Sequence, residues 1–126
     1  EGITEMVRSL KANTFMDVYF EEDGWRDDVI ELGATEELLH IVQEILTNIR
    51  KHARAQQVKI SLKITDLHLQ IGVEDNGIGF EYKASETSEG QGIGNMQDRA
   101  EKIDARLEIQ PTPGKGTKIF LSMTLK

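Results

Sequence analysis

Apolar residues recur along this chain with two periods, and the changes between these periods mark the predicted elements. Residues 3–10 place Ile, Val and Leu at helical spacing, and residues 16–20 then alternate as a strand before the polar stretch EEDGWRDD. A longer helical pattern runs from Thr35, the predicted N-cap, to Arg54. Acidic residues occupy its first turn and basic residues its last, the order that the helix dipole favours.

Four alternating runs and one more helical pattern complete the chain. Apolar residues alternate over 58–64 and again over 67–73, which predicts an antiparallel hairpin joined at Thr65–Asp66. Residues 96–103 then place apolar side chains at helical spacing. The last two runs, RLEIQ and TKIFLSMTL, predict a second hairpin around PTPGKG.

The resulting order is helix, strand, long helix, hairpin, polar loop, helix and hairpin, without internal repeats. The strands are too closely joined for parallel crossovers, which need about a dozen residues or more. We therefore expect an α+β protein, a two-layer α/β sandwich with a mixed or antiparallel sheet and helices on one face. The 126 residues fit one domain, 1–126.

Composition narrows the classes of function. The formal net charge of −7 argues against sequence-independent electrostatic binding to nucleic acid or anionic lipid. The absence of cysteine removes disulfides, thiolate zinc sites and thiol nucleophiles. No apolar run approaches the roughly 18 residues of a membrane span, and the acidic start EGITEM lacks signal-peptide features, so we expect a soluble chain. The absence of cysteine is compatible with a reducing cytosol, and we expect a cytoplasmic location. Because the chain starts without Met on a helical pattern, we expect a fragment excised from a longer protein.

The long helix has an apolar side and a polar side. Glu44, Asn48 and Lys51 lie on the polar side at i, i+4 and i+7, with His52 at its margin. This row is either a solvated face or a site for a metal-bound phosphate. In the second case the Asn48 amide oxygen suits Mg²⁺, the Lys51 ammonium suits a phosphate oxygen, and the Glu44 carboxylate can orient or deprotonate a nucleophile. The apolar side comprises Leu38, Leu39, Val42, Ile45, Leu46, Ile49 and Ala53.

Asp75 follows the strand 67–73 with the parity of its apolar residues. If the strand continues, the carboxylate points toward the core and needs a partner, because an unpaired buried charge costs several kcal/mol. If the strand has ended, DNG is a hairpin turn with Asp75 in water. A buried carboxylate would accept a hydrogen bond from an adenine amino group and reject guanine, whose oxo group only accepts. Asp75 is therefore a candidate base-recognition residue.

Two pairs of glycines flank a polar tract. Gly77 and Gly79 follow Asp75, and Gly92 and Gly94 precede the third helix. Glycine lets backbone lie against a bound ring, and a glycine-rich entry to a helix directs free N–H groups at an anion such as phosphate. The tract EYKASETSEGQ between the pairs has little to bury, so we expect a lid that is least ordered without nucleotide.

Other nucleotide-binding signatures are missing from the sequence. It has neither the GxxxxGK[ST] loop nor a GxGxxG after a strand, and it lacks the serine/threonine kinase motifs. The three histidines, His40, His52 and His68, lack metal-ligand spacing, and we interpret His40 and His68 as structural or surface residues.

Taken together, these motifs resemble the catalytic ATP-binding domain of bacterial two-component sensor histidine kinases, within the superfamily that includes gyrase, Hsp90 and MutL. HIVQEILTNIRKHA (40–53) resembles the N box, EDNGIGF (74–80) the G1 box, GQGIGNMQDRA (90–100) the G2 box and PGKGTKI (113–119) the closing hairpin. The pattern is most similar to the NarL/DesK-type subfamily. It departs from the family at Asp104–Ala105, where two glycines are usual.

The resemblance implies a Bergerat-type fold that binds ATP and Mg²⁺ between the long helix and the lid. Asn48 would chelate Mg²⁺, Glu44 would be the catalytic base or orienting group, and Lys51 and His52 would lie near the phosphates. Asp75 would bind the adenine amino group, and Thr117 would approach adenine through water. The pocket and lid would be shaped by Gly77, Gly79, Gly92 and Gly94.

In such a kinase the γ-phosphate passes to a histidine on a separate dimerisation domain and then to a response regulator. We accordingly expect a histidine kinase module that is incomplete alone, monomeric as a fragment, homodimeric when intact, and without nucleic-acid or membrane contacts of its own. Two alternatives remain: an anti-sigma-factor serine kinase, and a non-catalytic module whose nucleotide sets a protein interface.

Overall fold

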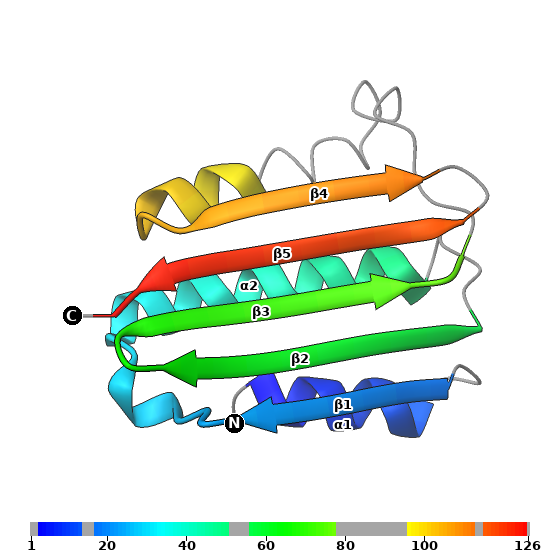
Figure 1. Cartoon of the computed structure of the whole chain (residues 1–126), viewed down its shortest axis with the longest axis horizontal. Coiled ribbons are helices and arrows are strands. Elements are labelled where there is room, and N and C mark those ends of the chain that lie inside the picture. Colours follow the sequence, from blue (N-terminus) through cyan, green and yellow to red (C-terminus); the bar gives the residue numbers. More distant parts are fainter. Residues whose placement is uncertain (1–2, 14–16, 51–55, 78–95, 113–114, 126) are drawn as a thin grey trace.

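The protein folds around one five-stranded sheet. The computed structural model describes residues 3–13, 17–50, 56–77, 96–112 and 115–125. Its strands are β1 (Asp17–Asp23), β2 (Gln57–Thr65), β3 (His68–Asp75), β4 (Arg106–Thr112) and β5 (Gly116–Thr124). They lie side by side in the order β1-β2-β3-β5-β4 (Figure 1). β1 and β2 run parallel and the other three neighbouring pairs antiparallel, so the sheet is mixed.

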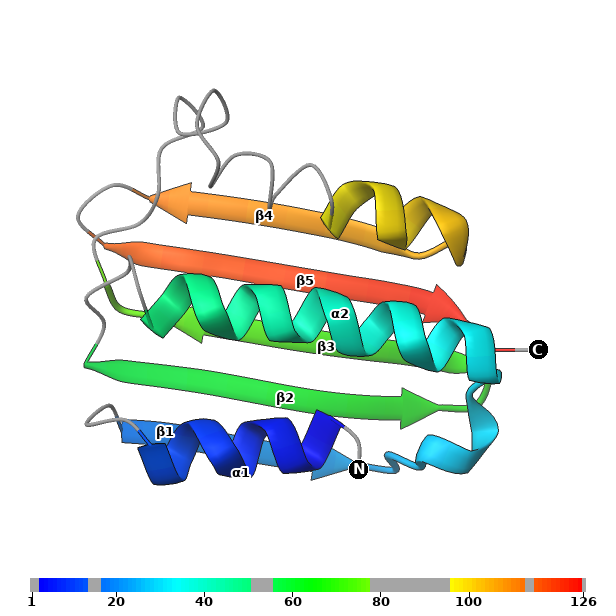
Figure 2. The ribbon, with the colours of Figure 1, turned by 180° about the vertical axis from the view of Figure 1, so that it is seen from behind.

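The described helices all lie on one face of this sheet (Figure 2). α1 (Ile3–Asn13) lies over β1, α2 (Leu32–Asn48) runs along the middle strands of the sheet, and a helical segment at 96–102 lies over β4. A short 3-10 helix, η1 (Asp27–Val29), precedes α2. The predicted α+β sandwich with helices on one face is confirmed. Within the described ranges, every helix is too short or too polar to cross a bilayer.

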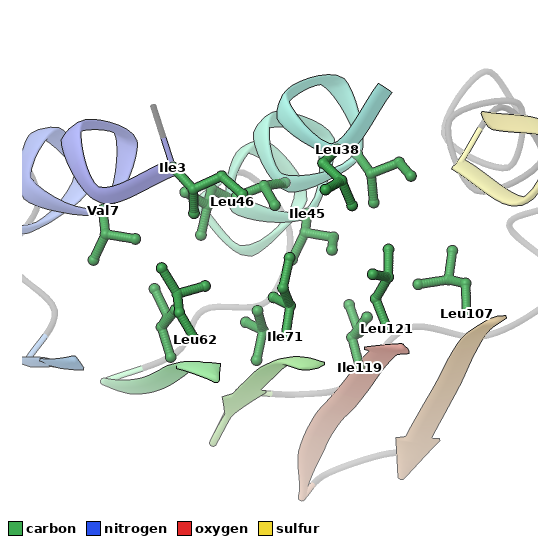
Figure 3. Packing of buried hydrophobic residues seen from close by; sticks show 14 of the residues in the cluster. Ile3, Val7, Leu38, Ile45, Leu46, Leu62, Ile71, Leu107, Ile119 and Leu121 are labelled. Carbon is green, nitrogen blue, oxygen red and sulfur yellow. The ribbon is translucent and has the colours of Figure 1, made fainter. Parts of the chain in front are cut away.

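The core fills the space between the helices and the sheet (Figure 3). Val7 and Ile45 point down from α1 and α2, and Ile71 and Leu121 point up from β3 and β5. Each is at most 2% exposed, and burying a side chain of this size stabilises the fold by about 1.5–3 kcal/mol. The alternating burial along β2 and β3 confirms the two-residue period that predicted them.

The start of α2 differs from the prediction. The helix begins at Leu32, with Glu31 as an N-cap that makes no side-chain capping bond. Thr35 is already inside the first turns, since its backbone N–H donates to the Glu31 carbonyl oxygen at 2.8 Å. Its hydroxyl donates to the same oxygen at 3.0 Å, the bond of a threonine inside a helix, whereas an N-cap threonine oxygen would accept from a backbone N–H. The predicted N-cap at Thr35 is therefore wrong.

The turn of the first hairpin is shifted by one residue. Thr65 pairs with His68, so Asp66 and Leu67 form the turn in place of the predicted Thr65–Asp66. Asp66 has a φ of +54°, a conformation that aspartate tolerates better than most residues. Leu67 is consequently 58% exposed, although the alternating pattern had placed it on the core side.

One strand pair runs parallel, contrary to the argument that the strands are too closely joined. β1 continues through Asp23, inside the predicted turn, and pairs in parallel with β2 from Asp17↔Gln57 to Asp23↔Lys63. The connection between these two strands contains α2, so it is long enough for a parallel crossover.

The departure at Asp104–Ala105 has a structural explanation. The Ala105 N–H donates to the Ala100 carbonyl oxygen at 2.8 Å and the Asp104 N–H to that of Glu101 at 3.1 Å, the two bonds of a Schellman motif that ends the segment 96–102. Asp104 takes the left-handed position with a φ of +54°. Glycine is the usual residue there, and aspartate is among the few replacements that tolerate it.

Candidate functional site

Three element ends meet at one edge of the domain. α2 ends at Asn48, β3 ends at Asp75, and β5 begins at Gly116 and Thr117. Figures 1 and 2 show these ends at the same side of the molecule, opposite the start of α2. The sheet register places Asp75 directly opposite Thr117. Residues from three separate sequence motifs thus converge on this edge.

Asp75 is the last residue of β3 and is only 4% exposed. The parity argument is confirmed and the solvated-turn interpretation is wrong. Its Oδ1 accepts a hydrogen bond from the Gly77 backbone N–H at 2.8 Å. Burial raises the pKa of the Asp75 carboxyl above its usual range, and hydrogen bonds from the backbone of Gly77 and Thr117 oppose this rise only in part.

Thr117 is the second buried polar residue at this edge. It is 2% exposed, and its Oγ1 has no hydrogen-bond partner within the described part of the chain. An unsatisfied buried hydroxyl costs about 1–3 kcal/mol. Together with Asp75 it presents one hydroxyl and one carboxylate that a ligand carrying both a donor and an acceptor would satisfy.

Gly116 makes this pairing possible, and sequence reasoning missed it as a site residue. Its φ is +102°, and a Cβ at this position would lie 2.0 Å from the backbone carbonyl oxygen of Asp75. Only glycine lets β5 start so close to the end of β3. The available signal was the glycine immediately before Thr117 in PGKGTKI.

Asn76 is a further residue that the sequence did not single out. Its Oδ1 accepts hydrogen bonds from the backbone N–H groups of Gln56 and Gln57, both at 2.8 Å. Its own N–H donates to the Gln57 carbonyl oxygen at 3.2 Å. Asn76 therefore ties the start of β2 to the end of β3, next to Asp75.

The polar row of α2 is not simply a solvated face. Asn48 is 7% exposed, Glu44 is half-buried, and His40 is exposed, as predicted for a surface residue. Beyond Asn48, Ile49 and Arg50 continue in a π-helical turn, a distortion that is frequent at functional sites. The residues of α2 that the structure buries are Ala34, Leu38, Ile41, Val42, Ile45, Leu46 and Asn48.

Half of the predicted site residues lie outside the described ranges. They are Lys51, His52, Gly79, Gly92 and Gly94, together with the predicted lid. Their roles stay predictions, as do those of the described site residues Glu44, Asn48, Asp75, Gly77 and Thr117. Among the residues that the structure does describe, no three His, Cys, Asp or Glu side chains gather as a metal site.

Comparison with known proteins shows which proteins this chain is similar to. The chain is 33% identical over 125 residues to the sensor histidine kinase LiaS of Bacillus subtilis, covering 99% of this chain and 34% of LiaS. It is 30% identical over 125 residues to the sensor protein VraS of Staphylococcus aureus, covering 99% of this chain and 35% of VraS. The chain thus spans about a third of the length of these relatives.

A solved structure shows the same fold. The histidine kinase domain of the Erythrobacter litoralis EL346 blue-light activated histidine kinase superposes with a TM-score of 0.76 at 19% identity, over 98% of this chain and 59% of that one. Residues 33–126 match the model of the histidine kinase-, DNA gyrase B- and HSP90-like ATPases. This match spans the three converging element ends, and the chain therefore belongs to that ATPase family.

Proposed function

We propose that this chain is the ATP-binding catalytic domain of a sensor histidine kinase of the NarL/DesK type. The observation that carries the proposal is the buried Asp75 carboxyl group at the edge where α2 ends, opposite the Thr117 hydroxyl, which has no hydrogen-bond partner among the described residues. Family membership supplies ATP as the ligand class. The names of LiaS and VraS, as a sensor histidine kinase and a sensor protein, support the kinase assignment.

Asp75 and Thr117 would recognise the base. The Asp75 carboxylate would accept a hydrogen bond from the exocyclic amino group of adenine, and the Thr117 hydroxyl would bond a ring nitrogen directly or through water. Guanine presents an oxo group in place of the amino group, so two acceptors would face each other and the site would reject it. Gly77 and Gly79 would allow backbone to lie against the ring.

Asn48 and its neighbours would hold the metal and the phosphates. The Asn48 side-chain oxygen is a hard ligand at the end of α2, and a single protein ligand plus phosphate oxygens and water completes a Mg²⁺ shell. When bound, Mg²⁺ neutralises charge that develops on the phosphates. Lys51, His52, Gly92 and Gly94 would contact phosphate oxygens. Glu44, one helical turn before Asn48, would orient the acceptor or accept its proton.

Phosphoryl transfer needs a partner that brings a nucleophile in line with the γ-phosphate. We propose a histidine on a separate dimerisation domain as this nucleophile, followed by transfer to a response regulator. The intact kinase would be a homodimer that works in the cytoplasm or is tethered to its membrane, and the isolated chain a monomer.

The test incubates the chain with γ-labelled ATP, Mg²⁺ and a dimerisation domain of a related sensor kinase. The expected product is label on the dimerisation domain that acid removes and alkali does not, the stability of phosphohistidine. Acid-stable label on a protein substrate would contradict this and favour a serine kinase. ATP binding without any transfer would also contradict it and favour a nucleotide-dependent binding module.

A further inference from the structure

One side chain attaches the turn after β3 to the start of β2. Asn76 Oδ1 accepts from the backbone N–H groups of Gln56 and Gln57, both at 2.8 Å. The Asn76 N–H donates in turn to the Gln57 carbonyl oxygen at 3.2 Å. Because the side chain and the backbone of Asn76 are both bonded to β2, the chain cannot rotate freely at this residue. The path of the chain directly after Asp75 is therefore set by β2.

This turn also orients the Asp75 carboxyl group. The terminal torsion of an aspartate side chain is broad, so its rotamer alone does not fix the plane of the carboxyl group. Here the Gly77 N–H donates to Asp75 Oδ1 at 2.8 Å. Such a bond between residues i and i+2, as in an Asx turn, needs a defined backbone conformation at the residue between them. Asn76 is that residue, so its bonds to β2 act on the orientation of the carboxyl group.

The two backbone donors of the Asp75 carboxyl group are held in different ways. The Thr117 N–H belongs to β5, and the pairing of Asp75 with Thr117 in the sheet fixes its position. Gly77 lies beyond the last pairs of β3 with β2 and β5, which both end at Asp75. The position of the Gly77 N–H therefore depends on the turn that Asn76 holds.

Base recognition by a carboxylate depends on this orientation, because a hydrogen bond weakens steeply when its geometry is poor. A rotated carboxylate would lose its bond to the adenine amino group and would no longer face the guanine oxo group. We infer that Asn76 is a positioning residue for base recognition, which fixes the turn 75–77 and thereby the orientation of the Asp75 carboxyl group. This inference rests on the proposed function and adds a residue that acts on specificity through Asp75.

The test compares ATP with GTP, which carry the same triphosphate. Calorimetric titration in Mg²⁺ gives the dissociation constants of both nucleotides for the wild type and for Asn76→Ala. Gln56, Gln57 and Asn76 are exposed, so water replaces the lost acceptor and the variant should fold, as circular dichroism would verify. The dissociation constant for GTP divided by that for ATP should fall about tenfold, within the range of coupling between contacting residues. An unchanged ratio, with or without a common loss of affinity, would overturn the inference.

Two matched variants separate the Oδ1 acceptor from other effects of the substitution. Asn76→Asp keeps an oxygen acceptor at this position, and its added charge acts on the triphosphate of both nucleotides alike. Its ratio should therefore lie within about twofold of the wild-type ratio. Thr35→Ala removes a side-chain bond to the backbone at the start of α2, at the opposite end of the domain, and should leave the ratio unchanged. A ratio for Asn76→Asp as low as that for Asn76→Ala would contradict positioning through this acceptor.

Hydrogen exchange in the protein without nucleotide tests the turn independently of ATP binding. In Asn76→Ala the amide proton of Gly77 should exchange at least about tenfold faster than in the wild type, while amide protons in the middle of β3 keep their rates. Equal acceleration throughout β3 would show a global loss of stability and contradict a local role of Asn76. If the wild type binds neither nucleotide, the proposed function fails. If it prefers ATP and Asn76→Ala keeps that preference, only this inference fails.

Discussion

At the scale of single residues, Asp75 has two opposed properties. Its burial favours the protonated carboxyl and so raises the pKa, whereas the proposed hydrogen bond from an amino group is strongest to the ionised form. A bound ligand that donates a hydrogen bond would stabilise the carboxylate and resolve this conflict. In the native protein without ligand, the buried carboxylate of Asp75 is thus less favourable than it would be in water.

The raised pKa has a measurable effect on stability. The native Asp75 holds its proton to higher pH than the unfolded chain, so its contribution to stability is full below the unfolded pKa of about 3.9 and is lost as pH rises to the native pKa. In the variant Asp75→Asn the side chain cannot ionise, so the variant does not lose stability in this way as pH rises. Urea denaturation gives the free energy of unfolding of each protein. The value for the variant minus that for the wild type should therefore rise between pH 4 and pH 7.

A control with the opposite sign is available in the same chain. A hydrogen bond from Arg26 lowers the pKa of the exposed Asp28 carboxyl. The ionised Asp28 therefore stabilises the fold above the unfolded pKa, and this stabilisation is lost as pH falls. The free energy of unfolding of Asp28→Asn minus that of the wild type should decline slightly from pH 4 to pH 7. A pH-independent difference for Asp75→Asn would show that its pKa is not raised in the native state.

Asn48 gives the second prediction at this scale. Asn48→Ala removes the proposed Mg²⁺ ligand and places a good helix former at the end of α2, so the fold should persist. ATP affinity in Mg²⁺ should fall about tenfold or more, and affinity in EDTA should stay near that of the wild type. His40→Ala, an exposed change on the same helix, is the control. An equal loss of ATP affinity with and without Mg²⁺ would contradict metal ligation by Asn48.

At the scale of elements, the junction of β3 and β5 depends on a glycine. Gly116→Ala would strain a φ of +102° and drive a Cβ into the Asp75 carbonyl oxygen, so we expect a loss of at least about 2 kcal/mol and weaker ATP binding. Gly33→Ala in α2 meets no atom within 4 Å and should stabilise by up to about 1 kcal/mol. Similar melting temperatures for the two variants would show that the junction is not strained.

The same elements show what a sequence pattern can and cannot determine. Alternation correctly predicted which face of β3 is buried, and therefore that Asp75 points inward. The reason is that successive side chains of a strand point to opposite faces, which is a local property of the backbone. Alternation misplaced Leu67 because pairing between strands, and not alternation, decides where a turn falls. The N-cap pattern misplaced the start of α2, because threonine occurs inside helices, where its hydroxyl donates to a carbonyl oxygen, as well as at their N-caps.

At the scale of the whole molecule, the two-layer α/β sandwich followed from the order of elements, but its long-range contacts did not. The parallel pairing of β1 and β2 and the Glu37–Arg99 pair join residues separated by dozens of positions, and no local period reports on them. Gly116 and the Thr117 hydroxyl gained their significance only when the register set them against Asp75. The three converging ends that form the candidate site are likewise a property of the assembled sheet and helix layer.

The most direct test of the account is the nucleotide preference of this chain, measured by calorimetric titration of wild type and Asp75→Asn with ATP and GTP in Mg²⁺. Because Asp75 would accept from adenine and repel the guanine oxo group, the wild type should bind ATP at least about a hundredfold more tightly than GTP. Asp75→Asn should lose both affinity for ATP and most of this preference. GTP binding as tight as ATP in the wild type, or unchanged ATP affinity in the variant, would contradict base recognition by Asp75.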